Sequence, residues 1–457
     1  MSFRHDLLNL YRRHVPAPLR DLMPRRLRAA GLGLAYRLTG YPDLKMWQMG
    51  LLHSLRGETG GQTGTPPEDA LFSCTLRPVP ASAMAGEPRS PAGRYMVEFG
   101  FHGLKVKGRL HDPGSIAAGH VDLCLDGHLL RRIGLVRRGP SRADILYTVR
   151  RPALALFAQS GQLSLRDAAG RLLEVDLVAM QQPARQTAPA TAVDLHIPFG
   201  TGRIFAELAA AGSLDKKGWP ALSAQALHAR QSRLLDLYTQ VNTVFQEQFS
   251  RPLFILYGTL LGQVRSGDFI PGDDDFDVGY ASICTTPESI KAEAMTIIEG
   301  LVAAGLTVSL NTVGRPFRVR AAGDPADIHL DTHIVFAPGD GHVWIHPRAH
   351  LPIPLALFGE MVTDQMRGGD ILRPAEAETY LEAHYGAGWR IPDPAYANIT
   401  TAEDPKVAKG LAQLCLTRAE QRALAQRIAA RKLPGAFIPT ALEPLYPLAR
   451  YHDRVGF

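Results

Sequence analysis

A run of four aspartates within five residues limits the local fold more than any other feature of the chain. The run consists of Asp273, Asp274, Asp275 and Asp277. Successive side chains of an extended chain alternate between two faces, so Asp273, Asp275 and Asp277 are expected on one face of a strand, with Phe276 and Val278 in the core. Carboxylates this close repel one another, and a hard cation held by oxygen ligands, Mg²⁺ or Mn²⁺, neutralises them. The run therefore predicts a metal site on a strand.

Two other interpretations of the acidic run are weaker. The spacing of its first, third and fourth aspartates matches the first three ligand positions of an EF-hand calcium loop. However, Val278 stands where that loop needs glycine, and Cys284 stands where it needs a bidentate glutamate. A solvated acidic turn is the second alternative, and the apolar residues interleaved with the acids disfavour it.

Small residues precede the acidic run, directly after an apolar strand expected at residues 253–257. Gly258, Thr259 and Gly262 are expected to form a turn there. Because their side chains are absent or small, the backbone of this turn could approach a phosphate closely. Arg265 lies in the same expected turn and is a candidate for a bidentate phosphate contact, with an ordinary surface arginine as the alternative. The predicted substrate-binding residues are Tyr257, Gly258, Thr259, Gly262 and Arg265.

Composition and periodicity divide the chain into parts of different character. Short alternating segments punctuated by Gly, Pro and Asp predict an all-β, sandwich-like domain, with a hairpin turn at Asp126-Gly127. Farther on, an amphipathic helix, a strand, a helix beginning near Thr286-Pro287 and further strands predict an α/β (α+β) domain with a mixed sheet. The expected parts are a basic arm (1–60), the β-sandwich-like domain (71–180), a linker (181–220), the mixed-sheet domain (221–400) and a C-terminal helical segment (401–457).

The net charge of +6 is concentrated in the basic arm, where ten Lys or Arg face four Asp or Glu. The neutral remainder argues against an extended nucleic-acid groove. The arm is expected either to contact the inner membrane surface peripherally or to pack as a helical extension on its own protein. Four widely spaced cysteines and the lack of any apolar run of about 20 residues favour a reducing, cytoplasmic location.

Two segments of the chain resemble a known family. The run YGTLLGQVRSGDFIPGDDDFDV, residues 257–278, resembles the signature of the LicD/fukutin family of the nucleotidyltransferase superfamily. Members of that family transfer phosphocholine or ribitol phosphate from CDP-activated donors to glycans. Residues 371–392, ILRPAEAETYLEAHYGAGWRIP, resemble the closing segment of the family. The resemblance covers about residues 225–395 and implies a nucleotidyltransferase-like catalytic domain there.

The resemblance also implies roles for individual residues. Asp275 and Asp277 would be the principal ligands of Mg²⁺ or Mn²⁺, with Asp273 assisting. The superfamily takes a further carboxylate from a later strand, which matches residues 326–334. Asp331 is favoured for that position and as a catalytic residue beside Asp275 and Asp277, while Asp327 on the same strand is the alternative.

The expected activity is metal-dependent transfer of a phospho-alcohol from a CDP-activated donor to a hydroxyl of a cell-surface glycan or lipid-linked glycan, as in capsule or lipopolysaccharide synthesis. One alternative is a nucleotidyltransferase that transfers a nucleoside monophosphate to a sugar, protein or RNA. Another is a non-catalytic glycan-binding protein, in which the β domain binds the glycan. The residues by themselves leave all three open.

Overall fold

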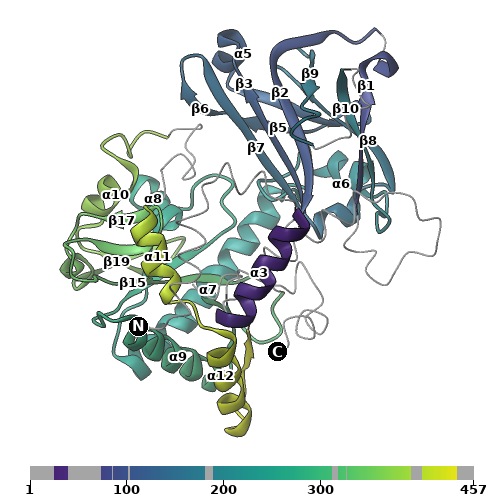
Figure 1. The fold of residues 1–457 in the computed structure, drawn as a ribbon. Coiled ribbons are helices and arrows are strands. Elements are labelled where there is room, and N and C mark those ends of the chain that lie inside the picture. Colours follow the sequence, from purple (N-terminus) through teal and green to yellow (C-terminus); the bar gives the residue numbers. More distant parts are fainter. Residues whose placement is uncertain are drawn as a thin grey trace. The chain divides into compact units, whose positions relative to one another are not determined.

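The computed structural model describes residues 25–39, 74–84, 86–100, 103–180, 189–310, 317–325, 327–392 and 404–439. The chain forms two compact units, one mainly from Lys45–Ser223 and the other mainly from Ala224–Pro392 and Thr401–Phe457. We call them the β unit and the α/β unit and describe each by itself (Figure 1). Within the basic arm the structure describes helix α3 (Arg25–Thr39), and the remainder of the arm lies outside the described residues. None of the described helices combines the length and apolar character needed to cross a membrane.

The β unit is built on one ten-stranded sheet. Its strands are β1 (Thr75–Pro80), β2 (Arg89–Gly100), β3 (Gly103–Leu110), β4 (His120–Leu125), β5 (His128–Gly134), β6 (Val136–Gly139), β7 (Arg142–Arg150), β8 (Ser160–Arg166), β9 (Leu172–Val175) and β10 (Ala190–His196). They follow the order β1-β10-β8-β9-β2-β3-β7-β6, and β4 joins β5 to β8. Neighbours are antiparallel except β2 and β9. The β-rich character expected for this part of the chain is confirmed.

Local sequence explains several features of the β unit. Asp126 (φ 50°) and Gly127 (φ 80°) join β4 to β5, which is the left-handed pair that a two-residue type I′ hairpin requires. Along β7, alternate residues are buried, and they belong to the core of the unit. Residues 181–220, expected as a linker, include β10 and helix α6 (Ile204–Ala211). The Ala and Pro content of that stretch obscured the alternation of Thr191, Val193 and Leu195, which are buried in the sheet.

The α/β unit contains a six-stranded mixed sheet with the order β11-β12-β15-β14-β13-β20. Its strands are β11 (Phe254–Ile255), β12 (Asp277–Ala281), β13 (Thr307–Leu310), β14 (Phe317–Arg320), β15 (Leu330–Val335) and β20 (Ala436–Ile438). The pairs β12/β15 and β13/β20 are parallel, and the other neighbours are antiparallel. Two hairpins complete the strands: β16 (Val343–His346) with β17 (Ala349–Leu351), and β18 (Met361–Met366) with β19 (Gly369–Pro374). The expected mixed sheet is therefore present.

Helices pack around this sheet, and their ends follow familiar capping rules. They are α7 (Ala224–Phe249), α8 (Tyr257–Ser266), α9 (Pro287–Ala303), α10 (Ala377–Tyr385), α11 (Pro405–Gln413) and α12 (Arg418–Ala430). Helix α7 buries Leu234, Tyr238, Val241 and Phe245 in the core, as its three-to-four spacing predicts. A capping box at Thr286 starts α9. Both helix predictions are confirmed.

The C-terminal segment, expected to be helical, also contributes a strand. Helices α11 and α12 are followed by β20, which pairs in parallel with β13. Gly435 makes this close approach possible, because a Cβ there would lie 2.1 Å from the Leu306 carbonyl oxygen and 2.6 Å from that of Val302. The three-residue strand is too short for periodicity to reveal it.

Candidate active site

The parallel pairing of β12 and β15 brings two of the predicted aspartates together. Asp277 and Asp331 are register partners, and the Asp331 N–H donates to the Phe276 carbonyl at 3.0 Å. On the next strand Arg318 is the register partner of Asp331. Side chains of directly opposed residues point to the same face of a sheet. The two carboxylates and one guanidinium therefore form a row across β12, β15 and β14.

The remaining aspartates lie in a loop in front of β12. Residues 273–276 have no strand structure, and β12 begins only at Asp277. The expectation of one strand face running from Asp273 to Asp277 was wrong, since strand pairing starts too late. The loop nevertheless gathers carboxylates: one oxygen each from Asp273, Asp274 and Asp275 lie within 4.8 Å of one another. Asp274 thus joins a cluster from which simple alternation excluded it.

Side chains of α7 hold this loop by its backbone. Gln231 Nε2 donates to the Asp273 carbonyl at 2.7 Å, and Arg230 Nε donates to the Asp274 carbonyl at 3.0 Å. Gln231 is fixed in turn by Arg367 Nη1, which donates to Gln231 Oε1 at 2.7 Å. Sequence reasoning missed all three residues, because no local motif links positions more than 40 residues apart.

Asp277 occupies a partly buried and crowded position. His333 Nε2 lies 3.2 Å from Asp277 Oδ1, and the Asp277 N–H donates to Thr259 Oγ1 at 3.0 Å. Burial raises the pKa of Asp277 above its usual range. The contact with His333 opposes this shift and lowers the pKa of Asp277. The negative charges of Asp331 and Asp275 raise it further. The ionised carboxylate therefore needs a compensating positive charge.

Asp331 has the opposite electrostatic setting. Arg318 Nε donates to Asp331 Oδ1 at 2.8 Å, and His329 Nε2 lies 3.6 Å from Asp331 Oδ2. Burial raises the pKa of Asp331, but His329 and Arg318 together outweigh burial and hold this pKa well below its usual range. Asp331 is thus a stable anion and a weak proton acceptor at neutral pH.

Asp327, the alternative to Asp331, lies away from this row. Its side chain is 65% exposed, compared with 20% for Asp331. Arg230 Nη1 donates to Asp327 Oδ2 at 2.6 Å, and the same guanidinium also binds the Asp327 carbonyl. Of the two aspartates, Asp331 is the register partner of Asp277.

The small residues expected in a turn lie instead in helix α8. The helix starts at Tyr257, whose φ of 44° is unusual for a non-glycine residue, and its cap residue Leu256 provides no side-chain hydrogen bond. A Cβ on Gly258 would lie 3.3 Å from Asp273 Oδ2, so the first turn of α8 approaches the acidic loop. A Cβ on Gly262 would lie 2.6 Å from the Asp268 carbonyl oxygen, so this glycine allows helix and loop to pack.

Arg265 lies in the last turn of α8. Its Nε donates to the Trp389 carbonyl at 2.7 Å, and its Nη2 donates to the Trp389 carbonyl and, at 3.3 Å, to the Ile391 carbonyl. These bonds tie α8 to the segment after α10. A phosphate-binding role for Arg265 stays a prediction.

Aromatic side chains line the side of the site where α8 meets α10. The Tyr257 ring lies 5.0 Å from that of His333, 5.1 Å from that of His384 and 6.4 Å from that of Tyr380. His333 in turn contacts Asp277. A continuous series of ring contacts therefore connects the Asp277 carboxylate with α10.

His384 is expected to make the protein less stable in mild acid. Burial lowers the pKa of His384 from 6.5 to about 4. Below pH 6.5 the unfolded chain binds a proton at this position that the folded chain does not accept until about pH 4. The stability that neutral His384 contributes is fully present above pH 6.5 and is lost as the pH falls from 6.5 to 4. The loss in the free energy of unfolding is roughly 3 kcal/mol at pH 4.

The variant His384→Phe keeps an aromatic ring and removes this proton site. We expect urea unfolding at pH 4.5 and 7.5 to show a smaller loss of stability in acid for the variant than for the unmodified chain. Other titrating groups are common to both proteins and cancel in the comparison. An equal loss in both would show that His384 is not held neutral in the folded state.

Comparison with known families identifies part of the α/β unit. Residues 251–351 match the sequence model described as LicD/FKTN/FKRP, nucleotidyltransferase domain. The matched segment contains Tyr257, the acidic loop, Asp277 and Asp331, while the closing segment at 371–392 lies beyond it. Comparison with curated proteins gave no match. Over residues 251–351 the chain resembles this family, and that resemblance points to a transferase with a phosphotransferase-like, glycan-modifying function.

Proposed function

We propose that the α/β unit is a divalent-metal-dependent phosphotransferase that moves a phospho-alcohol from a CDP-activated donor to a hydroxyl of a cell-surface glycan. The observation that carries this proposal is the register pairing of Asp277 with Asp331. Asp277 directly follows the loop that gathers the carboxylates of Asp273, Asp274 and Asp275. Both aspartates lie in the segment that matches the LicD/FKTN/FKRP domain. The donor class, phosphocholine- or ribitol-phosphate-like, follows from the resemblance of residues 257–278 to that family.

The residues at the site fit a hard divalent cation. The acidic loop offers clustered carboxylate oxygens, and Asp277 is a partly buried carboxylate repelled by Asp331 and Asp275. Oxygen-only ligand sets favour Mg²⁺ or Mn²⁺. In our proposal Asp273, Asp275, Asp277 and Asp331 hold the metal. A bound cation would neutralise the donor diphosphate and stabilise the charge that develops on it.

The first turn of α8 suits the donor phosphates. The first N–H groups of a helix have no intrahelical acceptor, and the helix dipole favours an anion there. At α8 these groups include the N–H groups of Gly258 and Thr259, and the cap residue Leu256 gives them no side-chain acceptor. We propose that they bind a phosphate of the donor beside the acidic loop.

The transfer step requires little from a general base. The acceptor hydroxyl oxygen forms a bond to the distal phosphorus and loses its proton to solvent, the bond from that phosphorus to the bridging oxygen breaks, and CMP leaves with the electron pair. Phosphoryl transfer depends mainly on positioning and charge stabilisation. Asp331, with its low pKa and its bond to Arg318, therefore suits a ligand role better than that of proton acceptor.

A ligand screen on the full chain tests the proposal. CDP-choline, CDP-ribitol, CDP-glycerol and the nucleoside triphosphates are added separately with and without Mg²⁺ or Mn²⁺, and the melting temperature and the released nucleotide or pyrophosphate are measured. We expect at least one donor to raise the melting temperature only with metal and to release CMP. Release of pyrophosphate from a nucleoside triphosphate would instead favour a nucleotidyltransferase. If neither metal affects nucleotide binding, the non-catalytic alternative holds.

A further inference from the structure

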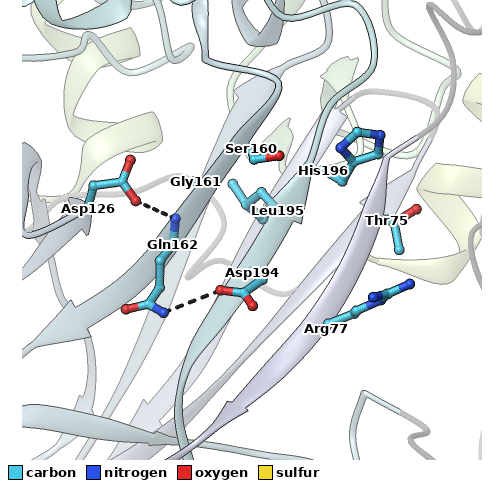
Figure 2. Close-up of a pocket in the computed structure, with 9 residues that line it drawn as sticks. All are labelled: Thr75, Arg77, Asp126, Ser160, Gly161, Gln162, Asp194, Leu195 and His196. Carbon is cyan, nitrogen blue, oxygen red and sulfur yellow. Dashed lines mark hydrogen bonds between the residues drawn. The ribbon is translucent and has the colours of Figure 1, made fainter. Parts of the chain in front are cut away.

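We propose that the β unit carries a groove that binds a neutral, hydroxyl-rich oligosaccharide. The groove lies on the strands β1, β10 and β8 and has a volume of about 610 Å³ (Figure 2). That volume is in the range of small-ligand sites. Its lining residues all belong to the β unit. Binding at this groove does not depend on the function proposed for the α/β unit. The further identification of the bound oligosaccharide as the acceptor of the transfer rests on that proposed function.

Strand register builds a grid of polar side chains on the floor of this groove. One row across the three strands is Arg77, Asp194 and Gln162, and the next is Thr75, His196 and Ser160. The rows are two residues apart along each strand, so all six side chains share one face of the sheet. Leu195, which lies between the rows on β10, points to the other face and is buried in the core. The opposite face of the sheet is therefore packed against the core, which holds the strands that carry the polar grid in place.

The β4–β5 hairpin turn forms a wall of the groove. The Asp126 N–H donates to the Gln162 carbonyl at 2.8 Å, and the Gln162 N–H donates to Asp126 Oδ1 at 2.7 Å. Gly161 lets the turn come this close, since a Cβ there would lie 3.0 Å from Leu125 Cδ1 and 3.2 Å from Asp126 Oδ2. Figure 2 shows Asp126 and Asp194 on opposite sides of Gln162, to which both are bonded. The wall is therefore fixed to the floor.

The exposed face ends after these two rows. The next register row along the same face is Val79, Ala192 and Ser164, and all three residues are buried. The open part of the face is consequently a bounded patch at the end of β1, β10 and β8 where the polar rows lie. An ordinary solvated sheet face would continue along the strands.

The chemistry of the lining selects the ligand class. The lining carries two carboxylates, Asp126 and Asp194, and one guanidinium, Arg77, so an anionic ligand such as a phosphate or an acidic glycan is disfavoured. The described lining contains no Phe, Tyr or Trp, and a flat aromatic ligand would find no stacking partner. The grid alternates donors with acceptors, and each hydroxyl of a sugar both donates and accepts. A neutral oligosaccharide satisfies these conditions.

The test is binding of the labelled full chain to a glycan microarray that carries neutral and acidic oligosaccharides. We expect binding to at least one class of neutral glycan. Arg77→Ala and Asp194→Ala should each weaken it about tenfold or more, because each removes charge-assisted hydrogen bonds. The matched control is Arg94→Ala, an exposed β2 arginine paired with Glu174, and it should leave binding within about twofold.

Further measurements separate this inference from the proposed function. Asp277→Asn should keep glycan binding, and Arg77→Ala should keep the metal-dependent melting shift with a CDP-alcohol. Circular dichroism of each variant reports whether the β unit stays folded. The inference is overturned if no neutral glycan binds, if acidic glycans bind in a way that the groove variants abolish, or if folded groove variants bind as well as the control.

Discussion

Asp331→Asn is expected to lower metal-dependent CMP release by a hundredfold to about a thousandfold, the size of effect seen when one preorganised charge is removed from an active site. The asparagine keeps the shape of the side chain but removes the negative charge that lies opposite Asp277 in the strand register. Its partner Arg318 would then carry an uncompensated positive charge beside the site and repel the cation. Both effects weaken the charge balance that we propose holds Mg²⁺ or Mn²⁺.

Asp327→Asn is the matched control for this prediction. The residue is four positions away, but its side chain is largely exposed and bound to Arg230. Because the Asp327 side chain is largely exposed, loss of its charge costs about 1 kcal/mol or less, and activity should stay within about threefold. Electron paramagnetic resonance of added Mn²⁺ gives a second readout that needs no donor, with weaker binding expected only for Asp331→Asn. If Asp327→Asn lost activity and Asp331→Asn kept it, the assignment of the site would be reversed.

Gly262→Ala is expected to destabilise the α/β unit by about 1–3 kcal/mol, as forced overpacking does. The new Cβ would lie 2.6 Å from the Asp268 carbonyl oxygen and 2.7 Å from the Ile270 backbone nitrogen. Backbone atoms cannot turn aside as a flexible side chain can, so α8 and the loop before the acidic run must separate. The midpoint of urea unfolding, measured by the signal that reports on the α/β unit, should fall accordingly.

Gly258→Ala provides the comparison within the same helix. Its Cβ would meet a side-chain oxygen, Asp273 Oδ2, at 3.3 Å, and that carboxylate can move by a few tenths of an ångström. We expect its stability to stay within about 1 kcal/mol of the unmodified chain, while metal-dependent donor binding weakens because the carboxylate of Asp273, a proposed metal ligand, is displaced. Equal destabilisation by the two substitutions would contradict a packing role specific to Gly262.

Some of the site could be predicted from sequence because it depends on local pattern. The acidic run before an apolar strand predicted Asp277. Asp331 was implied by the family resemblance, with Asp327 as the alternative, and its position beside Asp277 follows from the pairing of the two strands. The glycines were harder. Reading Gly258 and Gly262 as a turn overlooked Leu260 and Leu261, which are buried in helix α8. The low helix propensity of glycine was outweighed by the packing of these buried leucines.

The supporting residues were beyond the reach of local patterns. Arg367 donates two bonds to Asp268, at 2.6 and 3.0 Å, and one to Gln231, although it lies 99 and 136 residues away from them. Nothing in the neighbourhood of Arg367 along the chain distinguishes it from a surface arginine. The same holds for Arg318, which is the partner of Asp331 only because β14 lies beside β15. Such contacts are set by topology.

The strand β20 has a consequence for how this unit is assembled during synthesis. Residues 436–438 pair with β13, at the edge of the sheet opposite β11. A ribosome must therefore release more than 150 residues beyond Asp277 before that edge is paired, by the numbering of the chain. Until then β13 exposes unpaired backbone N–H and C=O groups, which attract other extended chains. A nascent or truncated protein that ends at α12 would present this edge, and protection from association would come only with its last described strand.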